Sequence, residues 1–156
     1  MSVEIKLEYL SDTCVRLTCL LEAPPERIYR AWTTPSEVVK WFVPDPDARC
    51  EVSQMDARVG GKYTMSVILP QERHTMTGEY TALEPNWLIR FTWQGTCGTG
   101  DDEISEVTVA LKPDGDGTQI TLIHDRQANR ASRDTHAKGW VRCLTGLMRY
   151  AAAQAF

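Results

Sequence analysis

Apolar and polar residues alternate along several short segments of the chain, with turn residues between them. This pattern is typical of half-buried antiparallel strands, whose successive side chains point to opposite faces of a sheet. The opening residues VEIKLEY alternate as well, and they form either an extra strand or the start of a bent one. The sequence therefore predicts an antiparallel sheet of about six to seven strands, with clear runs at residues 15–21, 63–69, 74–83, 87–93, 107–111 and 120–124.

The segment PPERIYRAWTTPSEVVKWF follows a helical period instead. Pro24 and Pro25 suit the start of a helix, because proline fits the first helical turn. Pro35 then ends this helix and opens a second short one. The residues available for burial on the two helices are Ile28, Ala31, Trp32, Val38, Val39 and Phe42.

The longest helical segment spans about residues 132–156. Apolar residues recur there at steps of four, three and four, which places them on one stripe of a helix. We expect this stripe to close the core against the sheet. It consists of Trp140, Leu144, Leu147 and Ala151.

The stretch DARVGG at residues 56–61 ends in paired glycines, which suit either a phosphate loop or a tight turn. A phosphate loop needs its glycines between a strand and a helix N-terminus, where free N–H groups face the anion. Gly60 and Gly61 lead into an alternating strand instead. We therefore expect a hairpin turn with a glycine at positive φ. Asp56 and Arg58 are expected to fix it by hydrogen bonds or an ion pair, with a catalytic role as the alternative.

Five stretches, taken in order, carry a resemblance to a known family: APPERIYRAWTTPSEVVKWF, DARVGG, TGEYTALEPNWLIRFTW, SEVTVALKPDGDGTQITL and GWVRCLTGL. Together they resemble the START-like (SRPBCC) superfamily, and within it the proteins similar to the activator of heat-shock-chaperone ATPase. The resemblance covers nearly everything from residue 12 to residue 153. It implies an α+β helix-grip (START/Bet v-like) fold, in which a curved antiparallel sheet wraps around a long C-terminal helix. Two short helices follow the first strand, and a cavity commonly lies between helix and sheet.

Composition excludes several classes of protein. The 156 residues suit a single domain over 1–156, and a net charge of -4 with a pI of about 5.4 argues against a nucleic-acid binder. The chain carries neither a signal-peptide pattern nor a stretch as long as a membrane span. Five cysteines without a C-x-x-C pair suit neither a disulfide framework nor a zinc site. We expect a cytoplasmic protein without a metal or other cofactor.

One amphipathic helix cannot fill the concave side of a strongly curved sheet, so large side chains are expected to line the remaining space. An apolar pocket of this kind is the default binding site. The alternative is that the aromatic residues are plain core, and that His124, which shares the parity of Ile120 and Leu122, is a satisfied core histidine. The candidate ligand-binding residues are Trp41, Met65, Tyr80, Phe91, Trp93, His124, Trp140 and Leu144.

Signals for catalysis are few. Cys97, in the predicted loop GTCGTGDD at residues 95–102, is conceivable as a nucleophile, but the sequence places no base beside it. His74 and His136 lie on other elements than His124, and no spacing makes a metal site among the three. The chain has no nucleophile-elbow motif. We therefore assign no catalytic residue.

Charge is uneven along the chain. Residues 101–106, DDEISE, are acidic, and they could attract the basic stretch 126–149 within a monomer or across a dimer. A solvated helix face is the alternative interpretation of the basic stretch. The stretch contains one carboxylate, Asp134. Its cations are Arg126, Arg130, Arg133, Lys138, Arg142 and Arg149.

Three functions from different classes remain. The chain binds a hydrophobic or aromatic small molecule in its cavity, or it is a cyclase- or aromatase-like enzyme, as the resemblance implies for part of the superfamily, or it is an interaction module for a chaperone. An enzyme needs at least two titratable groups near one cavity atom, whereas an interaction module needs an exposed patch. The sparse polar candidates favour the binder. We expect a monomer or homodimer with a hydrophobic small molecule as partner, and neither nucleic acid nor membrane.

Overall fold

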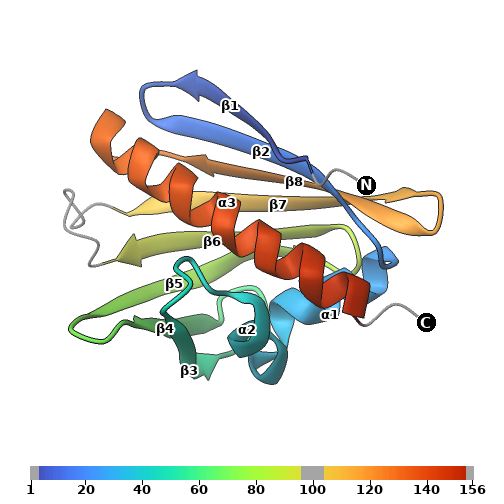
Figure 1. Ribbon diagram of the computed structural model, residues 1–156, viewed down its shortest axis with the longest axis horizontal. Helices are drawn as coiled ribbons and strands as arrows, with labels where there is room; N and C mark the ends of the chain where they lie inside the picture. Colours follow the sequence, from blue (N-terminus) through green and yellow to red (C-terminus); the bar gives the residue numbers. More distant parts are fainter. Residues whose placement is uncertain (1–3, 96–103, 154–156) are drawn as a thin grey trace.

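The computed structural model describes residues 4–95 and 104–153, and within them eight strands form one antiparallel sheet. The strand order is β1-β2-β8-β7-β6-β5-β4-β3. Figure 1 shows the sheet curving around the long helix α3, which is the predicted helix-grip arrangement. The strands are β1 (Lys6–Ser11), β2 (Cys14–Leu21), β3 (Arg49–Met55), β4 (Lys62–Ile68), β5 (Arg73–Glu84), β6 (Leu88–Gly95), β7 (Ser105–Asp114) and β8 (Gly117–Asp125).

The two edge strands account for the difference from six to seven predicted strands. The opening residues form a separate strand, β1, which turns into β2. The strand β3 was not predicted, because its alternation is broken: only Cys50 is fully buried, and a bulge lies between Val52 and Gln54. Each edge strand is exposed along one side, so its residues show a weaker apolar pattern than those of the central strands.

The helices α1 (Pro25–Thr33) and α2 (Pro35–Trp41) connect β2 with β3. Each begins with a proline in its first turn, as predicted. The indole N–H of Trp41 donates a hydrogen bond of 2.8 Å to the carbonyl of Ala31, which fixes α2 against α1. Their buried residues are Ile28, Ala31, Trp32, Val38 and Trp41, and Phe42 is buried directly after α2.

The helix α3 (Arg130–Ala153) lies across the concave face of the sheet, with α2 beside it (Figure 1). It begins two residues earlier than predicted, because the side chain of Asn129 accepts the N–H of Ser132 at 2.8 Å and caps the first turn. The predicted stripe is confirmed, since Trp140, Leu144, Leu147 and Ala151 are all buried. No helix of the described residues is both long and apolar enough to cross a membrane.

The paired glycines lie in the connection between β3 and β4, which excludes a helix N-terminus and confirms the turn. Gly60 has φ +86°, a conformation that L side chains rarely adopt. Its N–H donates to the carbonyl of Tyr80 at 2.8 Å, and the N–H of Tyr80 donates to the carbonyl of Gly61 at 2.9 Å. Arg58 and Asp56 form the expected ion pair at 2.7 Å. The turn is therefore tied to the strand β5.

The beginning of the basic stretch contacts the hairpin β1–β2. Arg130 pairs with Asp12 at 3.1 Å, and Arg133 donates to the carbonyl of Ser11 at 2.8 Å while its guanidinium lies 4.2 Å from the ring centre of Tyr9. Part of the stretch is therefore structural. Residues 101–103 of the acidic segment, like Cys97 and most of its predicted loop, lie outside the described residues.

Candidate functional site

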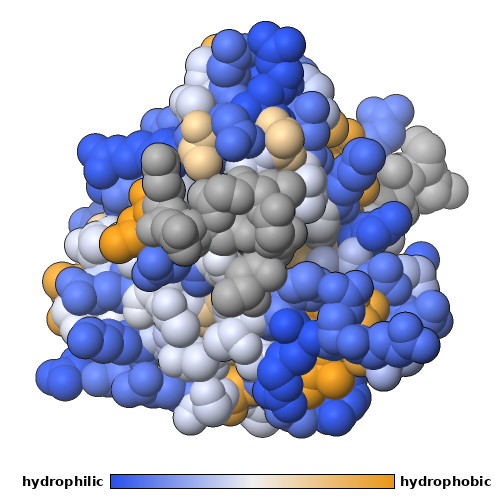
Figure 2. Space-filling model, turned by 90° about the vertical axis from the view of Figure 1, so that its left-hand side faces the viewer, coloured by the Kyte–Doolittle hydropathy of each residue, from blue (hydrophilic) through white to orange (hydrophobic). Residues whose placement is uncertain are grey.

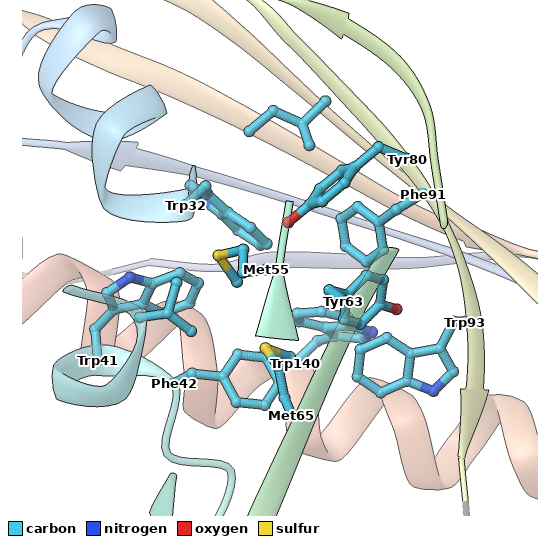
Figure 3. Close-up of a pocket in the computed structure, with 12 residues that line it drawn as sticks. Trp32, Trp41, Phe42, Met55, Tyr63, Met65, Tyr80, Phe91, Trp93 and Trp140 are labelled. Atoms are coloured by element: carbon cyan, nitrogen blue, oxygen red, sulfur yellow. The ribbon is translucent and has the colours of Figure 1, made fainter. Parts of the chain in front are cut away.

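The space between α3 and the sheet consists of two regions, and the first is a packed group of side chains that we call the inner cluster. Figure 3 shows its residues pointing toward one another from α1, α2, α3 and the strands. The volume left for the centre of a water-sized sphere is about 20 Å³, enough for about one water. The inner cluster consists of Trp32, Val38, Trp41, Phe42, Met55, Tyr63, Met65, Tyr80, Ile89, Phe91, Trp93 and Trp140.

Ring contacts and hydrogen bonds hold the inner cluster together. The rings of Trp32 and Trp41 lie 4.7 Å apart, and those of Tyr63 and Phe91 meet edge to face at 5.5 Å. The hydroxyl of Tyr63 donates to a backbone carbonyl in β6 at 2.6 Å. Burial raises the pKa of Tyr80 to about 12 and that of Tyr63 well above its usual 10. Both phenols are therefore neutral, and this region is core.

The second region, which we call the outer cavity, is open. It leaves about 410 Å³ by the same measure, in the usual range of ligand pockets of roughly 300–1,000 Å³. It lies between α3, the segment that follows α2, the hairpin β4–β5 and β6. Its lining residues are Phe42, Pro44, Asp45, Val67, Leu69, His74, Met76, Trp93, Thr135, His136, Lys138, Gly139, Trp140, Arg142 and Cys143.

The outer cavity has one apolar wall and one polar rim. Phe42, Val67, Met76, Trp93 and Trp140 are buried side chains that make up the apolar wall. Along the rim, α3 presents exposed polar side chains, and the loop after α2 adds a carboxylate. The polar residues of the rim on α3 and this loop are Thr135, Lys138, Arg142 and Asp45.

His124 lies beneath the outer cavity and is fully buried. Its Nδ1 accepts the indole N–H of Trp140 at 3.0 Å, which leaves the proton on Nε2, 2.7 Å from the hydroxyl oxygen of Ser105. That hydroxyl donates in turn to the carbonyl of Trp93 at 3.2 Å. Burial, and secondarily His136, lower the pKa of His124 well below its usual 6.5. The prediction of a satisfied core histidine is confirmed.

His136 lines the outer cavity from α3. Its Nδ1 lies 2.7 Å from Oε1 of Gln127, an acceptor, so the neutral ring carries its proton on Nδ1. The ring lies tilted against His124, with ring centres 4.7 Å apart, and meets the ring of Trp93 edge to face at 5.9 Å. His74 lines the same cavity from β5, and its Nε2 lies 3.1 Å from Glu72. The described residues contain no group of three or more side chains suited to hold a metal ion.

The sequence-predicted site residues fall into three sets. Trp93 and Trp140 line both the inner cluster and the outer cavity, whereas His124 and Leu144 line neither. The other four line only the inner cluster, and they are Trp41, Met65, Tyr80 and Phe91. The ligand-binding role of all eight residues stays a prediction.

Most residues that line the outer cavity were not predicted as site residues, although the sequence pattern indicates that some of them face inward. Val67 and Leu69 share the inward parity of Met65, and His136 lies one helical turn before Trp140 on the buried stripe. No pattern could have placed Pro44 and Asp45, because the loop after α2 reaches α3 only in the folded chain.

The described cysteines are buried thiols. Burial raises the pKa of Cys19 to about 12 and that of Cys50 to about 11, and it raises the pKa of Cys143, which lines the outer cavity, well above its usual 9. A thiol in this state is a poor nucleophile, since the thiolate is the reactive form. Cysteine chemistry is therefore not indicated at the outer cavity.

Comparisons with known proteins agree with this geometry. The family model described as "Activator of Hsp90 ATPase homolog 1-like protein" matches residues 22–152. No curated protein matches the chain. Among solved structures, a protein of Chromobacterium violaceum is 30% identical, with a TM-score of 0.81 over 89% of this chain and 97% of that one.

Two further structures share the fold at lower identity. A protein of Rhodobacter sphaeroides is 21% identical, with a TM-score of 0.83 over 96% of this chain and 99% of that one. DynU16, a putative protein in the dynemicin biosynthetic locus, is 21% identical, with a TM-score of 0.70 over 90% of this chain and 47% of that one. From the family match and the relative in C. violaceum, the chain belongs to the family of activator of Hsp90 ATPase homolog 1-like proteins.

Proposed function

We propose that this protein binds a small, largely apolar molecule in the outer cavity. The single observation that carries the proposal is an open volume of about 410 Å³ with buried aromatic walls. Ligand pockets typically combine such walls with a few polar groups that orient the ligand. The rings of Trp93 and Trp140 offer flat surfaces, which favours a planar ligand.

The inner cluster supports the proposal by limiting where a ligand lies. With room for about one water, it does not admit an organic molecule without displacement of packed rings. A ligand therefore rests against Trp93 and Trp140, which separate the two regions, and extends toward α3 and the loop after α2.

An exposed interaction surface receives less support. Figure 2 shows one end of the molecule, where hydrophobic residues lie in small separate groups among hydrophilic ones. Scattered apolar residues are normal on a monomer, whereas a partner surface usually forms a contiguous patch. The outer cavity, with its buried aromatic wall, is thus the better candidate for function.

The test uses a neutral fluorescent probe, phenylnaphthylamine, and a variant that fills the outer cavity. Gly139 lines the cavity from α3, and a Cβ added there would meet only Cβ of Pro44, at 3.8 Å. Gly139→Phe is therefore expected to project a ring into the cavity and to weaken probe binding at least about tenfold, since the ring and the probe compete for one volume. Gly139→Ala adds only a methyl group at the same position, so it is the matched size control and is expected to weaken probe binding far less than Gly139→Phe.

Met76→Trp is a second filling variant, which enters the cavity from β5. It keeps the test valid if Gly139→Phe perturbs the folding of α3. Thermal unfolding and circular dichroism establish that each variant is folded. Unchanged probe binding in both folded filling variants would refute the location. A wild-type protein that bound neither this probe nor a panel of aromatic and acyl compounds would refute the function.

Catalysis in the same cavity is a second candidate, favoured by the two imidazoles of His74 and His136 on its lining. Imidazole side chains commonly serve as general acids and bases in enzymes. If the bound compound is recovered unchanged in mass after long incubation with wild-type protein, the catalytic candidate fails and the binder stands. A product that forms with wild type and not with His74→Gln would support catalysis.

A further inference from the structure

We propose that the preferred ligand of the outer cavity is an organic acid, with its ring system against Trp93 and Trp140 and its anionic group at Lys138 and Arg142. This inference rests on the proposed function and adds the chemical class of the ligand. It follows from the spacing of the cations on α3, from their weak neutralisation and from the absence of a side chain at position 139.

The two cations face the outer cavity together. Lys138 and Arg142 are four residues apart on α3, so they lie on the same side of the helix, and both line the cavity. Asp45 is the carboxylate that lines it among the described residues. The rim therefore carries a local excess of positive charge, although the whole chain has a net charge of -4.

These cations are less neutralised than others in the molecule. Arg27 and Arg58 hold carboxylates at 2.6 and 2.7 Å, whereas Arg142 lies 4.0 Å from Asp45. Lys138 forms no ion pair with any residue in the described part of the chain.

Arg142 also keeps donors for a ligand. One Nη donates a bond of 3.3 Å to the carbonyl of Pro44, and a guanidinium has five N–H donors in all. The fork of these donors matches a carboxylate or a phosphate, and the ammonium of Lys138 adds a second charge.

Gly139 connects the cations to the aromatic wall. It lies between Lys138 and the buried indole of Trp140 in the sequence and lines the outer cavity. Glycine is a poor residue for a helix interior, and packing does not require it here, since an added Cβ would make only an ordinary contact with Pro44. What the missing side chain provides is space beside the helix, through which a ligand reaches from the rings to the cations.

The test compares naphthoic acid with naphthalenemethanol, its neutral counterpart of similar shape, by isothermal titration calorimetry. We expect wild type to prefer the acid. Lys138→Gln and Arg142→Gln are each expected to weaken binding of the acid about three- to tenfold, the range for a charge-assisted hydrogen bond at a partly exposed site, and to leave the alcohol unchanged. Asp45→Asn is expected to strengthen binding of the acid, because it removes a competing carboxylate.

Arg149→Gln is the matched control, since Arg149 is an exposed residue of α3 that does not line the outer cavity. It makes the same change in net charge and is expected to leave both affinities unchanged. Equal wild-type affinity for acid and alcohol would overturn this inference and leave the proposed function intact. An equal loss in Arg149→Gln would also overturn it, by showing that only the overall charge matters. Binding of neither compound would count against the proposed function itself.

Discussion

The inner cluster and the outer cavity lie under the same helix and share Trp93, Trp140 and Phe42, yet one is filled and the other is open. The difference comes from what covers each region. Trp32 and Trp41 of α1 and α2 insert into the inner cluster, whereas the outer cavity is covered by the loop after α2, which contributes Pro44 and Asp45.

This comparison corrects the expectation that large side chains merely line the space that α3 leaves. The aromatic residues from the two short helices fill that space in the inner cluster. A cavity persists where small or polar residues of α3, such as Gly139 and Thr135, line the space. The position of the open volume in this protein thus depends on the short helices and the loop that follows them.

The largest expected effect is on stability, where a substitution in the inner cluster should cost more than one at the outer cavity. Trp41→Ala removes a buried ring and its hydrogen bond to Ala31, and it is expected to lower the free energy of unfolding by about 3–5 kcal/mol. Leu69→Ala, at the half-buried wall of the outer cavity, is expected to cost less than about 1 kcal/mol. Urea denaturation measures both. Similar losses in the two variants would contradict the distinction between a packed and an open region.

Gly146 and Gly139 of α3 test the same comparison between a packed and an open region, because each can be changed by a single methyl group. A Cβ at Gly146 would overlap the carbonyl oxygen of Trp41, so Gly146→Ala is expected to destabilise the protein by about 1–3 kcal/mol through overpacking. Gly139→Ala meets no such obstacle and is expected to stabilise the helix by up to about 1 kcal/mol. Thermal unfolding should move the two melting temperatures in opposite directions. A loss of stability in Gly139→Ala would show that the cavity side of α3 is packed as well.

His124 stands at the boundary of the two regions, because it holds the indole of Trp140 that both share. Burial lowers the pKa of His124 in the folded protein. On acidification the histidine of the unfolded chain is therefore protonated near pH 6.5, whereas His124 of the folded chain stays neutral. The stability it contributes is full above about pH 6.5 and falls below it, by up to about 1.4 kcal/mol per pH unit.

Urea denaturation at several pH values checks this expectation against His124→Gln. The variant is expected to be less stable than wild type near neutral pH, because the bonds to Trp140 and Ser105 are altered, and to lose less stability on acidification. Parallel pH profiles of the two proteins would show that His124 titrates normally, and that the boundary is wetter than described.

Pattern alone predicted most of the strands and all three helices of the described residues. The central strands alternate because each buries one face, and the stripe from Trp140 to Ala151 repeats because one side of α3 is covered. It failed at β3, where an edge position and a bulge weaken the constraint on alternation. The turn at Gly60 was predictable because its backbone conformation is a local property of glycine.

The site was less predictable. Parity and helical period place Trp93 and Tyr80 on the inside equally well, since both are buried. Whether an inward side chain touches another ring or an open volume depends on elements far away in sequence. Trp32 meets Phe91 at 6.4 Å between ring centres, and no local pattern relates these two positions.

By itself, the sequence pattern determined the central strands, the covering stripe of α3, the glycine turn and the burial of His124, because each follows from a period or a conformational preference read over neighbouring residues. The helix-grip arrangement of these elements was implied by the resemblance to a known family. Only the tertiary structure decided that Tyr80 and Met65 belong to a filled region while His136, Lys138 and Arg142 border an open one. A cavity is the volume left unfilled after side chains from α1, α2, α3 and the sheet have packed. Its size and position therefore depend on all of these elements together.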